Sequence, residues 1–166
     1  MTEKVNAVTD QFTILIADRN PHVREFLRRE LVSEGYRVQV AKDGREVLMI
    51  INANNPLDLL ILDLEIPYVS GLAILEQLQD RDPPLPVVVH TFLTEYANHP
   101  AVQRAPGFLE KRGNNIDGLK ATVAQVIEKW YPQRKWHSQR TAAHANAQTE
   151  KGGVNNGGNK EDPLPL

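Results

Sequence analysis

Cysteine is absent from this sequence of 166 residues, which excludes disulfide bonds and metal sites built from thiolates. No apolar run is long enough to span a membrane. The N-terminal residues 1–11 lack the apolar segment of a secretory signal peptide, so a cytoplasmic location is expected. The formal net charge is only −2, and this small value argues against a general nucleic-acid binder.

The most informative stretch is a short apolar run at residues 57–62, LDLLIL, which ends in the carboxylate of Asp63. The run follows the helix breaker at residues 54–56 and is too short to form a helix. It is therefore predicted to be a strand buried on both faces, as in a parallel sheet. An acid at the carboxyl end of such a strand lies where open α/β sheets bind ligands. Asp is also common in ordinary turns, so this stretch alone leaves a purely structural role open.

Four further short strands are predicted, at residues 12–17, 36–40, 85–90 and 107–109. Helical patterns lie between the strands, and four of them begin after residues that are good N-caps: Asn20, Asp43, Ser70 and Asn115. Residues 95–104 could hold one short helix, but Pro100 is expected to interrupt it. The five histidines make no metal-ligand spacing and are expected on the surface or in loops.

Strands that alternate with helices predict a doubly wound α/β fold with a five-stranded parallel sheet. In the common flavodoxin-like strand order, 2-1-3-4-5, the first and third strands are neighbours. Asp18 directly follows the first strand, so it would lie beside Asp63 at one edge of the sheet. Thr91 and Lys111 each follow a later strand and would flank the two acids.

Three regions are expected along the chain: a flexible N-terminus at residues 1–11, one folded domain at 12–131 and a disordered tail at 132–166. The last region is rich in Gly, Asn and Gln, and its apolar side chains are too sparse to offset the entropy of ordering. It is also too poor in core residues for a DNA-binding domain, so output through protein contacts is expected.

The order and spacing of several short motifs resemble the receiver domain of two-component response regulators. The motifs are ILIAD at 14–18, EGYRV at 34–38, AKDG at 41–44, DLLILDLEIP at 58–67 with Gly71, PVV at 86–88 and Lys111. The resemblance covers residues 14 to about 130, which is nearly all of the part predicted to be structured. It implies the flavodoxin-like receiver fold.

The resemblance also implies a role for each site residue. Asp63 would accept a phosphoryl group as an aspartyl phosphate. Asp18, Asp63 and the backbone carbonyl of Glu65 would hold Mg²⁺. Thr91 and Lys111 would contact the phosphoryl oxygens, and Thr91 and Phe108 would move on activation. The physical chemistry agrees, because Mg²⁺ and an ammonium neutralise the charge that repels an attacking carboxylate.

The partners implied by the resemblance are a sensor histidine kinase or phosphotransfer protein and a downstream protein target in a phosphorelay. A homodimer through the last helix region is also expected. The chain would then be a signalling module rather than a conventional enzyme, limited to its own phosphorylation and dephosphorylation.

Three residues depart from the family pattern. Arg19 replaces the second acid of the usual pair and cannot ligate Mg²⁺, although it could pair with Asp63 or Asp18 instead. Phe92 stands where a small residue is usual, and its ring could narrow access to Asp63. Arg112 replaces the usual proline, which leaves the placement of the preceding lysine open.

Two alternatives remain open from the sequence. A degenerate receiver could act as a docking module that does not depend on phosphorylation, with its state set by Arg19. A flavodoxin-like cofactor binder would share the strand order, but residues 18–21 contain no glycine-rich phosphate loop.

Overall fold

Five parallel strands form the centre of the molecule in a computed structural model that describes residues 11–113 and 115–134. The strand order is β2-β1-β3-β4-β5, which confirms the predicted 2-1-3-4-5 sheet and the doubly wound α/β class. The strands are β1 (Thr13–Ala17), β2 (Arg37–Ala41), β3 (Leu59–Leu62), β4 (Val87–Thr91) and β5 (Gly107–Glu110). The helices are α1 (Pro21–Ser33), α2 (Gly44–Asn52), α3 (Gly71–Leu78), the 3-10 helix η1 (Thr94–Asn98), α4 (Pro100–Gln103) and α5 (Ile116–Trp130).

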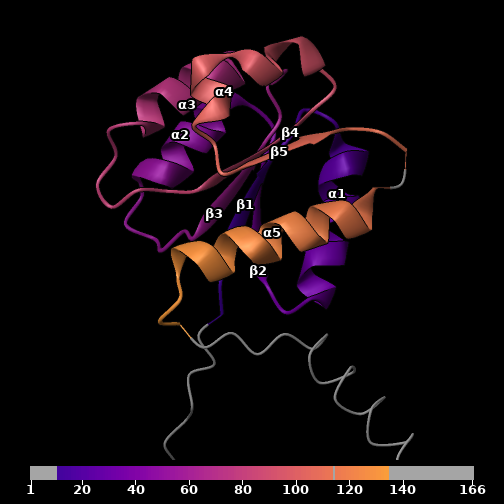
Figure 1. The fold of residues 1–166 in the computed structure, drawn as a ribbon, viewed down its shortest axis with the longest axis vertical. Helices are drawn as coiled ribbons and strands as arrows, with labels where there is room; N and C mark the ends of the chain where they lie inside the picture. The colour runs from indigo at the N-terminus through magenta and orange to yellow at the C-terminus, as the bar shows by residue number, and fades with distance from the viewer. Residues whose placement is uncertain (1–10, 114, 135–166) are drawn as a thin grey trace, which may run out of the picture. The chain divides into compact units, whose positions relative to one another are not determined.

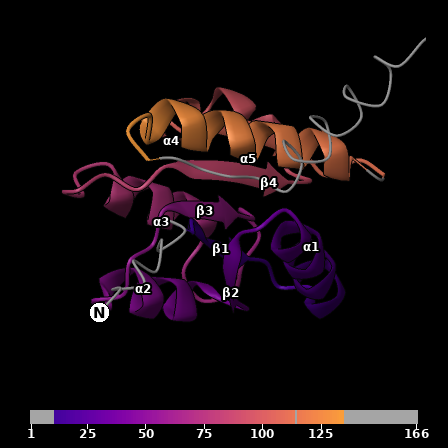
Figure 2. The ribbon, with the colours of Figure 1, turned by 90° about the horizontal axis from the view of Figure 1, so that it is seen from below.

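Helices cover both faces of the sheet, with α2, α3 and α4 on one side and α1 and α5 on the other (Figures 1 and 2). Two apolar cores follow from this arrangement. One contains alternate residues of the central strands, Leu15, Leu60, Leu62 and Val89, packed against α2, α3 and α4. The other contains Ile14, Ile16, Leu59, Ile61 and Val88, packed against α1 and α5. Because β1 and β3 are buried on both faces, their sequences are continuous apolar runs rather than alternating ones.

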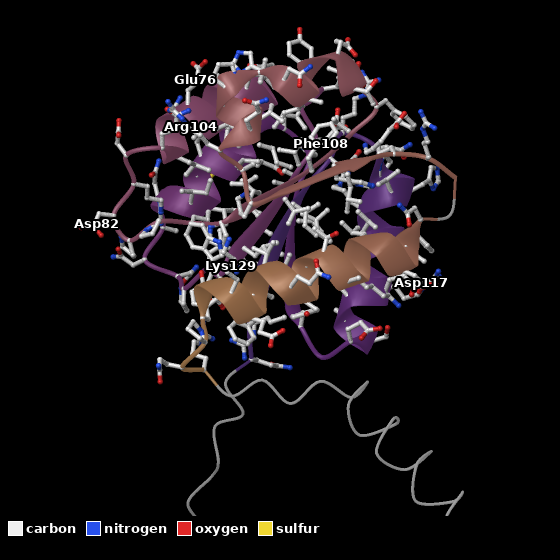
Figure 3. The ribbon with its side chains drawn as sticks, viewed as in Figure 1. Glu76, Asp82, Arg104, Phe108, Asp117 and Lys129 are labelled. Carbon is white, nitrogen blue, oxygen red and sulfur yellow. The ribbon has the colours of Figure 1, made fainter. Side chains whose placement is uncertain are left out.

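Side-chain caps fix where three helices begin, as the sequence predicted. Asn20 accepts a hydrogen bond from the His22 amide before α1, and Ser70 accepts one from the Ala73 amide before α3. Asp43 accepts from two amides at the start of α2. Asn115 also precedes its helix, α5, but makes no such bond. Instead, α5 carries Asp117 in its first turn and Lys129 in its last, which matches the helix dipole (Figure 3).

The segment between β4 and β5 differs from the expectation. Pro100 does not interrupt a helix but begins one, because it is the first residue of α4, where its missing amide costs nothing. The preceding residues form the separate 3-10 helix η1. The side chain of His99, which joins the two, accepts a hydrogen bond from the Ala101 amide at 3.2 Å.

A polar cluster at the amino-terminal ends of β1 and β3 contacts the residues that follow α5. Arg134 Nη1 lies 2.5 Å from Asp58 Oδ1, and its guanidinium lies 4.0 Å from the ring centroid of Phe12. Tyr131 donates its hydroxyl hydrogen to the Asp58 carbonyl at 2.6 Å, and Asp58 Oδ2 accepts from the Thr13 amide at 2.8 Å. Burial and the charge of Asp58 raise the pKa of Tyr131 to about 12, so the phenol remains a donor.

This cluster includes a residue of the region that was predicted to be a disordered tail. Arg134 belongs to the predicted tail at 132–166, yet it contacts the start of β3. Residues 135–166 of that tail, and residues 1–10 of the predicted flexible N-terminus, lie outside the described residues. Among the helices that the structure describes, none is long and apolar enough to cross a membrane.

Candidate functional site

Asp18 and Asp63 lie side by side at the carboxyl edge of the sheet. They directly follow β1 and β3, which are neighbours with Ala17 opposite Leu62. The Asp63 amide donates to the Ala17 carbonyl at 3.0 Å, which extends the pairing up to the acid. Both acids are almost fully buried, at 2% and 3% exposure. Two carboxylates this buried require a compensating positive charge or hydrogen bonds.

Lys111 supplies that charge from the end of β5. Its Nζ atom lies 2.8 Å from Asp63 Oδ2 and also forms an ion pair with Asp18 Oδ2. The lysine side chain is only 8% exposed. Its backbone amide donates to the Thr91 carbonyl at 2.9 Å, which holds the chain beside β4. The neighbouring Arg112 therefore does not prevent the lysine from reaching the two acids.

The remaining carboxylate oxygens accept hydrogen bonds from the turns in which they lie. Asp18 Oδ1 accepts from the Asn20 amide at 2.8 Å, and Asp63 Oδ1 accepts from the Glu65 amide at 3.1 Å. Arg24, on α1, donates from Nη1 to the backbone carbonyl of Asp18 at 2.6 Å. Arg24 was not among the residues predicted for the site. Its one available signal was a cation four residues after the N-cap residue Asn20.

Thr91 lies on β4, the neighbour of β3, and Phe108 lies on β5, one strand further from the acids. Thr91 is completely buried, and its hydroxyl oxygen accepts a hydrogen bond from the Leu93 amide at 3.1 Å. Among the described contacts, its hydroxyl makes no bond to Asp63 or Lys111. Phe108 is half-buried on β5 and packs against the core under α2, α3 and α4 (Figure 3).

The two departures from the family pattern next to the site both point outward. Arg19 is exposed and forms no ion pair or hydrogen bond with any residue that the structure describes. The pair with Asp63 or Asp18 that Arg19 could have formed is therefore absent, because Lys111 already lies against both acids. Phe92 is 64% exposed, and its ring centroid lies 5.3 Å from the lysine Nζ atom. The ring flanks the ammonium at the rim of the site.

His90 was expected on the surface or in a loop, but it lies on β4 and is half-buried. It lines a mostly apolar hollow of about 160 Å³, together with residues of α1, α5 and the end of β5. Burial, and then the charge of Lys111, lower the pKa of His90 to about 4. This imidazole is therefore neutral at pH 7.

The donor set at this edge fits Mg²⁺. This ion binds one or two carboxylates in proteins and keeps water or phosphate oxygens as its other ligands. Asp18 and Asp63 provide two buried carboxylates, and Glu65 adds a backbone carbonyl two residues later. No cluster of three or more His, Cys, Asp or Glu side chains suited to a metal occurs within residues 11–113 and 115–134. A metal held by these two acids would have to share them with the Lys111 ammonium.

Sequence comparison places these residues in a known family. Residues 14–124 match the response regulator receiver domain. The chain is also 42% identical over 78 residues to the response regulator MprA of Mycolicibacterium vanbaalenii, an alignment that covers 47% of this chain and 33% of that protein. The chain thus spans about one third of the length of the curated relatives it matches.

Solved structures of response regulators also resemble this chain. The response regulator TrrA from Thermotoga maritima, in complex with Mg²⁺-BeF, matches with a TM-score of 0.63 and 31% identity, covering 69% of this chain and 98% of that one. A second structure, the histidine kinase ThkA in complex with TrrA, matches with a TM-score of 0.63 and 30% identity, covering 69% and 97%. These matches favour a receiver over the cofactor-binder alternative, and they give no support to the docking-module alternative. Because the family match at residues 14–124 spans well over half of the sequence, this chain belongs to the response regulator receiver domain family.

Proposed function

We propose that Asp63 is the phosphoacceptor of this receiver domain. The observation that supports the assignment is the Lys111 ammonium bound to both buried acids at the carboxyl edge of the sheet. A carboxylate that attacks a phosphoryl group meets repulsion between anions, and a fixed cation beside it lowers that barrier. Asp63 is buried, ionically paired and located at the end of a central strand, as such a nucleophile requires.

The proposed donor is a phosphohistidine on a sensor histidine kinase or a phosphotransfer protein. One oxygen of Asp63 forms the new P–O bond while the P–N bond to the donor imidazole breaks, and the imidazole leaves with the electron pair and takes up a proton. The product is an aspartyl phosphate. The ThkA–TrrA complex, whose regulator is 30% identical to this chain, supports a kinase as the partner.

The other site residues are assigned by what they can contact. Lys111 turns its ammonium toward the phosphoryl oxygens, and the buried hydroxyl of Thr91, at the carboxyl end of β4, donates a hydrogen bond to them. Asp18, Asp63 and the Glu65 carbonyl would hold Mg²⁺, which when bound neutralises charge on the transferring oxygens. The structure of TrrA in complex with Mg²⁺-BeF supports the binding of Mg²⁺ by this chain.

We further assign signalling to contacts made by the face next to β5, with Thr91 and Phe108 as the residues that change position. A downstream protein target or a second copy of the chain, bound through the region of α5, would detect this change. A cytoplasmic location follows from the proposed exchange with a kinase. These assignments rest on the family and on the half-buried position of Phe108.

Labelling of the purified chain tests the acceptor. With phosphoramidate and Mg²⁺, the wild-type protein should gain one phosphoryl group that hydroxylamine removes, as expected for an acyl phosphate. Asp63→Asn should gain none, and Asp117→Asn, a change at an exposed acid on α5, should label as the wild type does. Label that persists in Asp63→Asn would show that another residue is the acceptor. A wild-type protein that no donor or kinase labels would support the docking module.

A further inference from the structure

Arg24 makes an unusual contact with the backbone next to the site. Its Nη1 atom donates to the carbonyl of Asp18 at 2.6 Å, and this is the one hydrogen bond to that carbonyl among the described residues. Regular strand pairing ends at Ala17, so the carbonyl of the next residue has no partner in the sheet. Asp18 is 2% exposed, and a buried carbonyl without a partner is unfavourable.

We propose that Arg24 is a positioning residue for the phosphoacceptor site, an inference that rests on the proposed function. Arg24 holds the peptide that joins Asp18 to Arg19, and this fixes the direction of the Asp18 carboxylate toward Asp63. The guanidinium does not touch the reacting atoms. It acts through the backbone of the acid that stands beside the acceptor.

The need for such a residue follows from the double role of Lys111. In the structure described here, the lysine ammonium holds both acids. When it turns toward an incoming phosphoryl group, Asp18 loses that contact. The Asp18 amide still donates to the Ala41 carbonyl at 3.2 Å, which holds the residue on its N-terminal side. The carboxylate and the carbonyl of Asp18 then keep one bond each, from the Asn20 amide to Oδ1 and from Arg24 to the carbonyl. Arg24 thus keeps Asp18 in place during the step in which the lysine is elsewhere.

The charge of Arg24 suits this task. A hydrogen bond from an ionised donor is stronger than one between neutral groups, and guanidinium is weakly hydrated enough to be half-buried. A purely structural alternative is that Arg24 merely joins α1 to β1. The two possibilities differ in what happens to Asp18, so measurements on Asp18 and its turn separate them.

The first measurement is hydrogen exchange of the Asn20 amide in metal-free protein, because this amide donates to Asp18 Oδ1. Arg24→Met keeps a side chain of similar length but removes the donor, and should speed this exchange by at least about tenfold. Arg24→Lys keeps the charge and should retain part of the protection. Arg28→Met is the matched control on the same helix, because Arg28 is exposed and pairs with Glu25 at 2.7 Å. It should leave the exchange unchanged.

The second measurement is the rate of phosphorylation by phosphoramidate as a function of donor concentration. Arg24→Met should lower the maximal rate constant by about tenfold and leave the half-saturating donor concentration nearly unchanged. Arg24→Lys should recover part of the rate, and Arg28→Met should match the wild type.

Two outcomes would overturn the inference. Unchanged exchange of the Asn20 amide in a folded Arg24→Met variant would show that Arg24 only joins α1 to β1. If Arg24→Met does not fold, the same conclusion would follow from an Arg24→Lys variant in which both the Asn20 exchange and the phosphorylation rate equal those of the wild type. A raised half-saturating concentration at an unchanged maximal rate would make Arg24 a donor contact instead. If the wild type takes no label, the proposed function fails, while the exchange of Asn20 still decides whether Arg24 positions Asp18.

Discussion

The Nζ atom of Lys111 lies 2.8 Å from Asp63 Oδ2 while it also pairs with Asp18 Oδ2. One positive charge is thus shared by two buried negative charges. The site keeps an excess negative charge in the absence of a metal, and a divalent cation would compete with the ammonium for the same oxygens. This relationship makes stability and metal binding interdependent.

The first prediction concerns the stability of the Lys111→Met variant. Removing one partner of a buried ion pair leaves its acids uncompensated, so the metal-free variant should lose on the order of 3 kcal/mol of unfolding free energy. Mg²⁺ should restore more of this stability than it adds to the wild type, because no ammonium competes for the acids. Thermal unfolding with and without Mg²⁺ measures both effects.

A matched control exists in Lys120, which also pairs with two acids, Glu30 at 2.8 Å and Glu34 at 3.3 Å, but lies on α5 away from the site. Lys120→Met should show no added response to Mg²⁺. An equal response in the two variants would mean that Asp18 and Asp63 are not the metal ligands.

The second prediction concerns Arg19, which is exposed and leaves the acids to Lys111. Arg19→Asp adds a carboxylate and removes a positive charge at the mouth of the site. We expect it to bind Mg²⁺ at least about tenfold more tightly, which is about 1.4 kcal/mol, and to be phosphorylated faster at low Mg²⁺. A Mg²⁺ titration followed by NMR measures the affinity.

Arg19→Asn separates the two causes, because it removes the charge without adding a ligand. An intermediate affinity would assign part of the effect to repulsion of the cation by the guanidinium. Equal affinities in the wild type and Arg19→Asp would show that the arginine side chain has no influence on the metal site.

The third prediction is a pH dependence set by His90. Its pKa is lowered to about 4 in the folded protein, whereas the ordinary value, about 6.5, applies to the unfolded chain. Above pH 6.5 the imidazole is neutral in both states. As the pH falls below 6.5, the unfolded chain takes up a proton that the folded protein does not, so stability decreases until about pH 4.

Between pH 7 and pH 5, His90 should therefore cost the wild type about 2 kcal/mol of unfolding free energy. Urea denaturation of His90→Val should lack this part of the pH dependence, while His22→Gln, at an exposed position, should retain it. The carboxylates are the same in all three proteins, so their contribution to the pH dependence of the unfolding free energy cancels when the proteins are compared. Identical pH dependence in the wild type and His90→Val would contradict the assignment.

The fourth prediction concerns the ion pair between Arg134 and Asp58. A chain that ends after Pro132 lacks Arg134 and leaves a buried carboxylate with one partner fewer. It should unfold at a temperature lower by at least about 3 °C, the shift that roughly 1 kcal/mol causes in a domain of this size. A chain that ends after Arg134 should match the full-length protein in a calorimetric scan. Equal midpoints for both shortened chains would show that the pair contributes nothing to stability.

Much of the fold could be predicted because it depends on local patterns. Short apolar runs and helix caps gave the elements, and the acids at the ends of β1 and β3 followed from the strand order. The position of Lys111 directly after the last strand could be expected in the same way, whereas the placement of its side chain was left open by Arg112. Each of these required only the order of elements along the chain.

Other contacts could not be predicted, because they depend on the direction of long side chains. The sequence pattern does not show whether the Arg19 side chain turns toward Asp63 or toward solvent. In the structure Arg19 is exposed, because the Lys111 ammonium already pairs with the acid. The pair of Arg134 with Asp58 joins residues 76 positions apart. It lies beyond the last helix, where the amphipathic pattern has already ended.

The cluster around Asp58 and the proposed acceptor Asp63 lie at opposite ends of β3. Asp58 precedes β3 and Asp63 follows it, so the anchor of Arg134 lies roughly 16 Å from the acceptor, given about 3.3 Å per strand residue. In a chain that ends at Arg134, a tag or a solid support attached directly to that residue would thus be held at the edge of the sheet away from the chemistry. Immobilisation by that end should leave the acceptor edge open to a kinase in solution, which makes it the suitable orientation for a surface-based binding assay.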